Sequence, residues 1–273
     1  MGAIIRFIAT YMGMALRFFY DLTLNYGVAI ILFTIFIKLV LIPLTYKQQK
    51  SLKESQELQP ILTEIQKKYK DEPEKQQQEL MKVYQERKIN PMGGCLLMLI
   101  QFPIIISMFY AVAQPITYMF PEELQKSEVT SAIEKYVGDN GRQNTYKEVF
   151  YISNEREDLL NTKFLGLDLA QVPNSDKGNI ILWIIPILSA LTTYLTSKIS
   201  ISQTKQNAGK NEEASEQAVK MQKNMSFFLP LMTGYIAFIV PLGMGLYWMV
   251  NNVTTLLVQI GIMKIMNKPV EKV

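Results

Sequence analysis

The stretch that decides the fold is Val28-Ala-Ile-Ile-Leu-Phe-Thr-Ile-Phe-Ile-Lys38-Leu-Val-Leu-Ile-Pro43-Leu44, an apolar run that contains one lysine. A run of this length is typical of a helix that crosses the hydrocarbon core of a membrane. A lysine near the middle of such a helix costs about 2.5 to 3.5 kcal/mol on insertion scales, and ionisable residues at that depth usually serve a function. The run therefore predicts a membrane span with a candidate functional charge inside it.

The average composition hides the membrane character of the chain. Its 273 residues are 49% hydrophobic, and the mean hydropathy is only +0.09. The apolar residues are nevertheless concentrated in five blocks, at about 28–44, 94–114, 180–197, 225–240 and 243–266. About 20 such residues cross a bilayer core as a helix. We therefore expect an all-α polytopic membrane protein with a core of five transmembrane helices.

Residue usage argues against conventional catalysis. The chain has no histidine and one cysteine, Cys95, which excludes an intrachain disulfide and sites built on histidine. We find no Walker phosphate loop, no G-x-S-x-G elbow and no H-E-x-x-H motif. We expect no enzymatic activity, no cofactor, no metal and no direct nucleic-acid site.

The distribution of positive charge predicts the topology. Ten Lys and Arg lie in 45–92, five in 198–223 and three from 264 onward, whereas two lie near the N-terminus and seven in 115–178 together with eleven Asp and Glu. Cytoplasmic segments of membrane proteins carry the excess of Lys and Arg. With five spans, this places the N-terminus outside and the C-terminus in the cytoplasm.

Spans and polar segments alternate along the chain. In order, we expect an amphipathic helix on the outside (1–26), span one (27–46), a cytoplasmic helical hairpin (47–92), span two (93–115), an outside segment (116–178), span three (179–198), a polar cytoplasmic linker (199–223), span four (224–240), span five (243–266) and a cytoplasmic tail (267–273). The pattern predicts no particular fold for 116–178.

The N-terminal segment and the hairpin each leave alternatives open. On a helical wheel of residues 3–22 the polar side chains form one stripe, which favours a helix lying in the membrane interface; a sixth span or a signal peptide without a clear cleavage site would also fit. Within 47–92, apolar spacings suit two amphipathic helices, with the stop signal Asp71-Glu72-Pro73 at the tip between them. A solvated tether between spans is the alternative.

Polar residues in four of the five spans predict a shared hydrophilic groove. Each unsatisfied polar group is costly in hydrocarbon, so stripes on different helices are expected to face one another or water. The candidate groove residues are Lys38, Thr34, Gln101, Thr192, Thr196, Tyr247, Trp248, Asn252 and Gln259. Helix-packing contacts are the alternative for the Ser, Thr and Asn residues. For Lys38 the alternatives are snorkelling to the surface and a hydrogen-bonded structural role.

A positively charged, hydrated cavity open to the cytoplasm suits one task in particular. It could receive a hydrophilic, often acidic, segment of a polypeptide while the apolar flank of that polypeptide moves into lipid. Binding energy and the membrane potential, worth about 2.3 kcal/mol per charge per 100 mV, would drive the step.

Three ordered motifs carry a family resemblance. They are Phe36-Ile-Lys38-Leu-Val-Leu-Ile-Pro43-Leu-Thr45-Tyr-Lys-Gln48, then Lys88-Ile-Asn90-Pro91-Met-Gly93-Gly94-Cys95 with Gln101-Phe-Pro103, and Gly245-Leu-Tyr247-Trp248-Met-Val-Asn251-Asn252. The chain resembles the YidC-type membrane protein insertases of the YidC/Oxa/Alb family over nearly its whole length outside 115–165. It is similar to the shorter, Gram-positive type, although a lipoprotein cysteine near the start is missing.

The resemblance implies a five-helix core around a groove that opens to the cytoplasm and to lipid. In the family, a groove arginine occupies the position of Lys38. The resemblance also implies a substrate contact at Thr34 and an aromatic contact at Trp248. Lysine keeps the charge but lacks the bidentate fork of arginine. The hairpin corresponds to the cytoplasmic coiled coil of the family, and the implied partners are nascent membrane proteins, the lipid bilayer, the ribosome, the signal recognition receptor and the Sec translocon, at the bacterial plasma membrane.

Three functions therefore compete. The first is an insertase and membrane-protein chaperone. The second is a secondary transporter or channel for a small anion, for which we find no internal repeat of the kind that transporters use. The third is a structural scaffold whose spans act as anchors.

Overall fold

The chain folds almost entirely into helices. The computed structural model describes residues 2–87, 93–136, 145–176, 178–207 and 212–266. The elements are α1 (Ala3–Thr23), α2 (Tyr26–Val40), α3 (Ile42–Glu57), α4 (Gln59–Lys68), α5 (Pro73–Glu86), α6 (Gly93–Ala113), α7 (Pro115–Tyr118), α8 (Ser127–Glu134), α9 (Lys147–Glu155), α10 (Ile184–Asn207), α11 (Glu212–Ile239) and α12 (Leu242–Met266), with the strands β1 (Lys163–Phe164) and β2 (Leu167–Asp168) and the short 3-10 helices η1 (Pro121–Gln125), η3 (Pro173–Ser175) and η4 (Ile180–Trp183).

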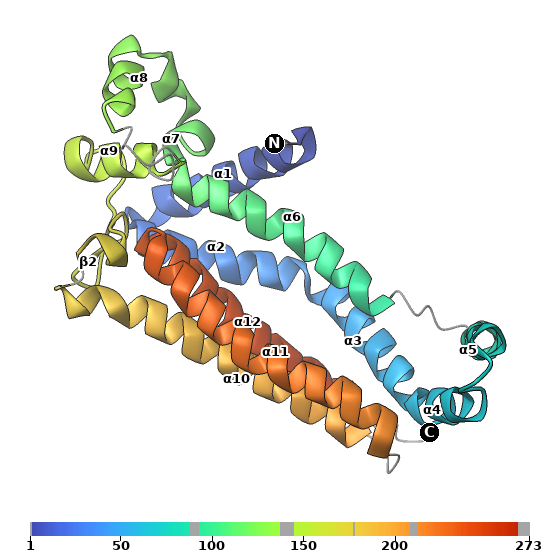
Figure 1. Ribbon diagram of the computed structural model, residues 1–273. Helices are drawn as coiled ribbons and strands as arrows, with labels where there is room; N and C mark the ends of the chain where they lie inside the picture. The colour runs from blue at the N-terminus through green and yellow to red at the C-terminus, as the bar shows by residue number, and fades with distance from the viewer. Residues whose placement is uncertain (1, 88–92, 137–144, 177, 208–211, 267–273) are drawn as a thin grey trace.

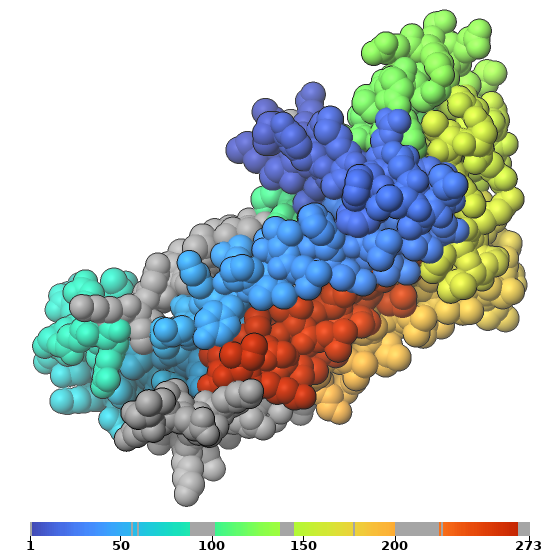
Figure 2. Space-filling model, turned by 180° about the vertical axis from the view of Figure 1, so that it is seen from behind, coloured from blue at the N-terminus to red at the C-terminus, as the bar shows by residue number. Residues whose placement is uncertain are grey.

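The long helices form an elongated bundle with a different small unit at each end. Helices α4 and α5 lie at one end, and α7, α8, α9 and the β1–β2 hairpin lie at the other (Figure 1). Helix α12 packs against α2 and α10, α10 packs against α11, and α1 packs against α2 and α6. From behind, α2 and α3 lie alongside α12 (Figure 2).

Several helices are long and apolar enough to cross a membrane. Within the described residues these are Ala3–Thr23, Ile180–Ile199 and Leu242–Met266, and the bent pair α2–α3 makes a fourth if it is one span. The apolar stretches Phe102–Ala113 and Ser226–Ile239 are shorter. The protein is thus an all-α membrane protein, and the five-span core stays a prediction.

The first predicted span is broken. Helices α2 and α3 meet at Leu41 at an angle of 57°. Pro43 lies just after the break, where its ring would clash with the carbonyl of Leu39 in a continuous helix and where it donates no hydrogen bond. The break places Lys38 in the last turn of α2 rather than in the middle of a continuous 27–46 helix.

Helix α1 turns its polar stripe toward the protein. Gly13 is buried against the backbone of Tyr118, where a Cβ atom would not fit. Arg17 donates to the Met119 carbonyl at 3.0 Å and pairs with Glu122 at 2.5 Å. The polar stripe therefore packs partly on α6, α7 and the residues that follow, and an apolar face of α1 is exposed. Whether the helix lies in the interface stays a prediction.

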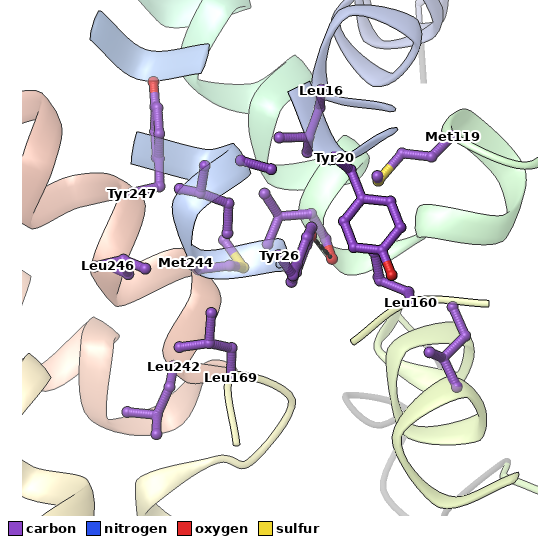
Figure 3. Close-up of a cluster of buried hydrophobic side chains, with 14 of the residues drawn as sticks. Leu16, Tyr20, Tyr26, Met119, Leu160, Leu169, Leu242, Met244, Leu246 and Tyr247 are labelled. Atoms are coloured by element: carbon purple, nitrogen blue, oxygen red, sulfur yellow. Dashed lines mark hydrogen bonds between the residues drawn. The ribbon is translucent and has the colours of Figure 1, made fainter. Parts of the chain in front are cut away.

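The buried core lies where the bundle meets the segment after α9. Side chains from α1, α2, α12 and residues 160–169 converge there (Figure 3). The buried residues drawn in that view include Leu16, Tyr20, Tyr26, Leu160, Leu169, Leu242 and Met244. Within a membrane, van der Waals contacts between such side chains contribute to the packing of helices.

Backbone hydrogen bonds attach residues 160–171 to the ends of α2 and α12. The amide of Tyr26 donates to the Asn161 carbonyl at 3.0 Å, and the amides of Leu242 and Gly243 each donate at 2.9 Å to the carbonyls of Gln171 and Leu169. These are amides at helix N-termini, which lack partners within their own helices. The segment that had no predicted fold thus satisfies the ends of two helices of the bundle.

The predicted linker 199–223 is mostly helical. Helix α10 continues to Asn207 and α11 begins at Glu212. The residues after Glu212 include many Glu, Ala, Gln and Lys, which favour helix without any packing. The long polar stretch is therefore occupied by extensions of two spans. The predicted tail 267–273 lies outside the described residues.

Candidate functional site

Lys38 lies in a narrow pocket between four helices. Its walls come from α1, α2, α6 and α12, and the lining residues are Met12, Phe33, Thr34, Ile37, Lys38, Leu41, Ile104, Met108, Tyr247 and Asn251. The structure thus brings together three of the predicted groove residues, Lys38, Thr34 and Tyr247, from helices that are far apart in the sequence.

No acidic side chain among the described residues neutralises the charge of Lys38. No salt bridge to Lys38 occurs within the described ranges. The lysine is half-buried in the last turn of α2, the negative end of the helix dipole. A cation there gains about 0.3 to 1 kcal/mol in exposed helices. Because the other walls are largely apolar, the ammonium group would attract an anionic group that entered the pocket.

The pocket is nearly closed in this conformation. The space beside Lys38 is about 10 Å³, close to the smallest volume that holds one water molecule. Thr34 is 2% exposed, and its hydroxyl donates to the Ile30 carbonyl of its own helix at 2.6 Å. A polypeptide segment could enter only if the helices around Lys38 moved apart.

A larger cavity lies between α6 and α12. It measures about 290 Å³ and is lined by Ile105, Ile106, Met108, Phe109, Tyr110, Val112, Met244, Tyr247 and Trp248. Met108 and Tyr247 line both this cavity and the Lys38 pocket. Trp248 therefore lies in the adjoining apolar cavity rather than beside Lys38.

Two predicted groove residues form a helix-packing contact instead. The Asn252 amide nitrogen donates to the hydroxyl of Thr193 at 2.8 Å and lies 3.4 Å from the hydroxyl of Thr192. Ser189 is fully buried and donates to the Gly245 carbonyl at 3.0 Å. These bonds join α10 to α12, as the packing alternative for the third span expected.

The remaining predicted groove residues lie elsewhere. Thr196 donates to the Thr192 carbonyl of its own helix at 2.9 Å. Gln259 lies further along α12, and its buried side-chain oxygen has no hydrogen-bond partner among the residues that the structure describes. Gln101 belongs to α6, but its side chain lies outside the described residues.

Asn251 lines the Lys38 pocket, although it was not among the candidate groove residues. It lies four residues after Tyr247, on the same face of α12, and one residue before the candidate Asn252. Asn252 has the same i, i+4 relation to Trp248, so the sequence alone could not distinguish the two asparagines.

Helices α4 and α5 pack against each other as a helical hairpin. Helix α4 ends at Lys68 and α5 begins at Pro73, where a missing backbone N–H is tolerated. Asp71, Glu72 and Pro73 are all exposed. A shallow hollow beside the tip is lined by Glu72, Pro73, Glu74, Lys75, Gln78 and Glu79. The tip is of mixed charge, because Lys70 and Lys75 lie beside the acidic residues and Lys75 pairs with Glu72 at 3.4 Å.

Known proteins resemble the chain along nearly all of its length. Residues 18–269 match the family model described as the 60Kd inner membrane protein. Proteins named membrane protein insertase YidC are similar: that of Oceanobacillus iheyensis is 32% identical over 84% of this chain and 71% of its own length, and that of Caldanaerobacter subterraneus is 29% identical over 90% and 89%.

Other relatives are much longer than this chain. The protein of the same name from Geobacter metallireducens is 29% identical over 90% of this chain but only 34% of its own length. The chain thus spans about a third of that relative. The family match over residues 18–269 and the apolar helices together identify the chain as a member of the YidC-type family of multi-pass bacterial plasma-membrane proteins.

Proposed function

We propose that the chain is a membrane protein insertase and chaperone. In this proposal the Lys38 pocket is the closed form of a groove that accepts hydrophilic segments of nascent membrane proteins, while their apolar segments pass into lipid. The observation that carries the proposal is the grouping of Lys38, Thr34, Tyr247 and Asn251 around one pocket, with no carboxylate paired to the lysine among the described residues. The names of the relatives support the same activity.

The ammonium group of Lys38 in a largely apolar pocket would select acidic segments of a substrate. Charge interactions are stronger where water is scarce than in bulk solvent. An acidic segment entering beside Lys38 would exchange part of its hydration for this attraction. The adjoining cavity of about 290 Å³, lined by Trp248 and apolar residues of α6, would take the apolar flank. Separation of α6 from α12 would join the two spaces.

The topology follows from the charge distribution. We infer that α4, α5 and the C-terminus lie in the cytoplasm and that the N-terminus and α7–α9 lie outside. The exposed, charged tip of the hairpin, with Asp71 and Glu72, would then be available to the targeting machinery. The ribosome, the signal recognition receptor and the Sec translocon are the partners that the family resemblance implies.

Site-specific photocrosslinking during translation tests the groove. A photoreactive residue is introduced at Trp248 or at Thr34, and a stalled ribosome carries a single-span membrane protein with an acidic tail. The matched control is Leu257 on the same helix, which is 63% exposed on the surface of the bundle. We expect crosslinks to the nascent chain from positions 248 and 34 at an early chain length, before any from position 257.

Other outcomes would favour the competing functions. Equal crosslinking from all three positions would contradict a groove, because it would mean contact through the lipid-facing surface alone. Absence of crosslinks together with saturable, Lys38-dependent anion uptake into liposomes would support a transporter. Loss of function on deletion of the hairpin, with no effect of Lys38 variants, would support a scaffold.

A further inference from the structure

Two leucines in neighbouring turns adopt a left-handed backbone conformation. Leu24, between α1 and α2, has a φ of 52°, and Leu165, at the tip of the β1–β2 hairpin, has a φ of 50°. They are the non-glycine residues with positive φ in the described part of the chain. Glycine, asparagine and aspartate adopt this conformation at the lowest cost, and leucine does so at a higher one. Turn geometry alone therefore does not explain leucine at both positions.

Both leucine side chains are exposed. Leu24 is 68% exposed and Leu165 is 86% exposed. Neither turn therefore gains appreciably from apolar burial within the protein. Gly166, which follows Leu165, has a φ of 79° and completes a two-residue turn between the strands. In water, asparagine or aspartate at position 165 would adopt this left-handed conformation at a lower cost than leucine.

The two turns form one structural unit. The Asn25 side-chain amide donates to the Lys163 carbonyl at 2.9 Å, and the Tyr26 amide donates to the Asn161 carbonyl at 3.0 Å. Gly27 lies against the ring of Phe164 so closely that a Cβ atom would not fit. The leucines are thus held at the end of the bundle that carries α7–α9 (Figure 1).

This unit continues an exposed apolar face of a candidate span. Large side chains three or four residues apart follow one side of α1: Ile4, Phe7, Tyr11, Met14, Phe18 and Leu22. Leu22, which is 65% exposed, is two residues from Leu24. At the same end, Ile180 is 76% exposed just before α10. In a multi-pass membrane protein, exposed apolar faces of candidate spans are covered by lipid.

Polar residues flank the leucine tips. Asn25 and Asn161 take part in the hydrogen bonds between the turns, and Lys163 is two residues from Leu165 and pairs with Glu157 at 2.8 Å. Amphipathic helices that rest in the membrane interface likewise combine an apolar side with a polar, basic side. The unit therefore fits a lipid surface better than a fully aqueous setting.

We propose that Leu24 and Leu165 insert into the leaflet at this end of the bundle and anchor residues 145–176 to the membrane surface. The two side chains contact the boundary between lipid headgroups and acyl chains. Removing two exposed leucines from water offsets the cost of their left-handed backbone. Through the β1–β2 hairpin, residues 145–176 contact the membrane surface, although they lie outside the predicted spans.

Depth-dependent fluorescence quenching tests the anchor in the full chain. The single cysteine is removed by Cys95→Ser, and an environment-sensitive fluorophore is attached after Leu165→Cys or, as the matched control, after Ser131→Cys. Ser131 is exposed on α8, in the same region between the spans. In lipid nanodiscs we expect blue-shifted emission at position 165, quenching by lipids that carry a spin label near the headgroup, and protection from aqueous iodide. Position 131 should show the opposite pattern.

A second variant separates anchoring from folding. Leu165→Asn suits the left-handed turn and removes the apolar tip, so the melting temperature should be kept or raised. A fluorophore at position 24 should then shift toward the red and lose protection from iodide. Iodide quenching at position 165 as strong as at 131 would overturn the proposal. Protection from both quenchers at 165 would also overturn it, because a protein rather than lipid would then cover the hairpin.

Discussion

Helix α12 carries two polar clusters that differ in how their members are paired. On the side of α10, Asn252 donates to Thr193 at 2.8 Å and Ser189 donates to the Gly245 carbonyl at 3.0 Å. On the side of α2, Asn251 and Lys38 line one pocket, and no hydrogen bond or salt bridge between them is found among the described residues. The members of the first cluster bond to one another, whereas Asn251 and Lys38 in the second cluster do not.

The difference indicates that polar residues on the two sides of α12 have different roles. A paired asparagine between two helices contributes on average about 0.6 kcal/mol to their association in a membrane. An unpaired lysine near apolar walls is costly, and it is retained where a function requires it. We therefore expect stability to depend on the α10 side of α12 and insertion to depend on the α2 side.

Reversal of the charge at Lys38 should have the largest effect. Lys38→Glu places a carboxylate where an acidic substrate segment would bind, and like charges brought together in an interface cost several kcal/mol. We expect insertion of a single-span protein with an acidic tail to fall roughly a hundredfold at unchanged expression. Protease protection of the translocated tail in proteoliposomes measures this rate.

Two variants control for net charge and for the kind of cation. Lys47→Glu changes the charge of the chain equally at an exposed position of α3 beyond the bend, and it should leave insertion nearly unchanged. Lys38→Arg should preserve activity because it keeps the charge. Normal insertion by the Glu variant would disprove an electrostatic role for the pocket.

A methyl group on the paired side should lower stability. A Cβ atom at Gly245 would lie 2.7 Å from the Ile185 side chain, so Gly245→Ala must separate α10 from α12. We expect a loss of about 1 to 3 kcal/mol in unfolding free energy, as for other overpacked cores. Thermal unfolding in detergent, followed by circular dichroism, measures the change.

Gly261 supplies the matched control on the same helix. A Cβ atom there meets nothing within 4 Å. Gly261→Ala should therefore keep or raise the stability, by up to about 1 kcal/mol through helix propensity. Equal losses in both alanine variants would mean that the α10–α12 contact is not tight at Gly245.

The helical faces could be predicted from the sequence, but their partners could not. Asn251 and Asn252 are adjacent on α12, yet one lines the Lys38 pocket and the other bonds to Thr193. Adjacent residues on a helix point about 100° apart. A polar arc wide enough to include both residues therefore meets two different neighbours, and only the packing of α2 and α10 decides which.

The local signals in the sequence varied in strength. Apolar length predicted the apolar helices, and Asp71-Glu72-Pro73 predicted the turn between α4 and α5. The break at Leu41 had its signal in Pro43, which the apolar run concealed. Residues 160–171 depend on hydrogen bonds to the ends of α2 and α12, so no local pattern could predict their course.

The adjacent residues Asn251 and Asn252 allow the α2 side and the α10 side of α12 to be compared by two single substitutions. Asn252→Ala removes the bond to Thr193, so it should lower the unfolding free energy by about 0.6 kcal/mol and leave insertion unchanged. Asn251→Ala should leave stability unchanged and slow insertion about threefold, as expected for loss of one modest polar contact with a substrate. Paired measurements of unfolding and insertion on both variants give the result. If the two profiles were the same, α12 would not have two functionally distinct faces.

Thr34→Val should have the smallest effect, although Thr34 lines the same pocket as Lys38. Its hydroxyl already donates to the Ile30 carbonyl at 2.6 Å, and valine matches its shape. The valine variant loses the bond to Ile30 within the helix, and toward a substrate it loses only an oxygen lone pair. We therefore expect insertion to change less than about twofold, within the energy of a weak hydrogen bond. A loss as large as that of Asn251→Ala would mean that the Thr34 oxygen accepts a hydrogen bond from the substrate. The Lys38 pocket would then recognise polar groups of the substrate through Thr34 as well as its charge through Lys38.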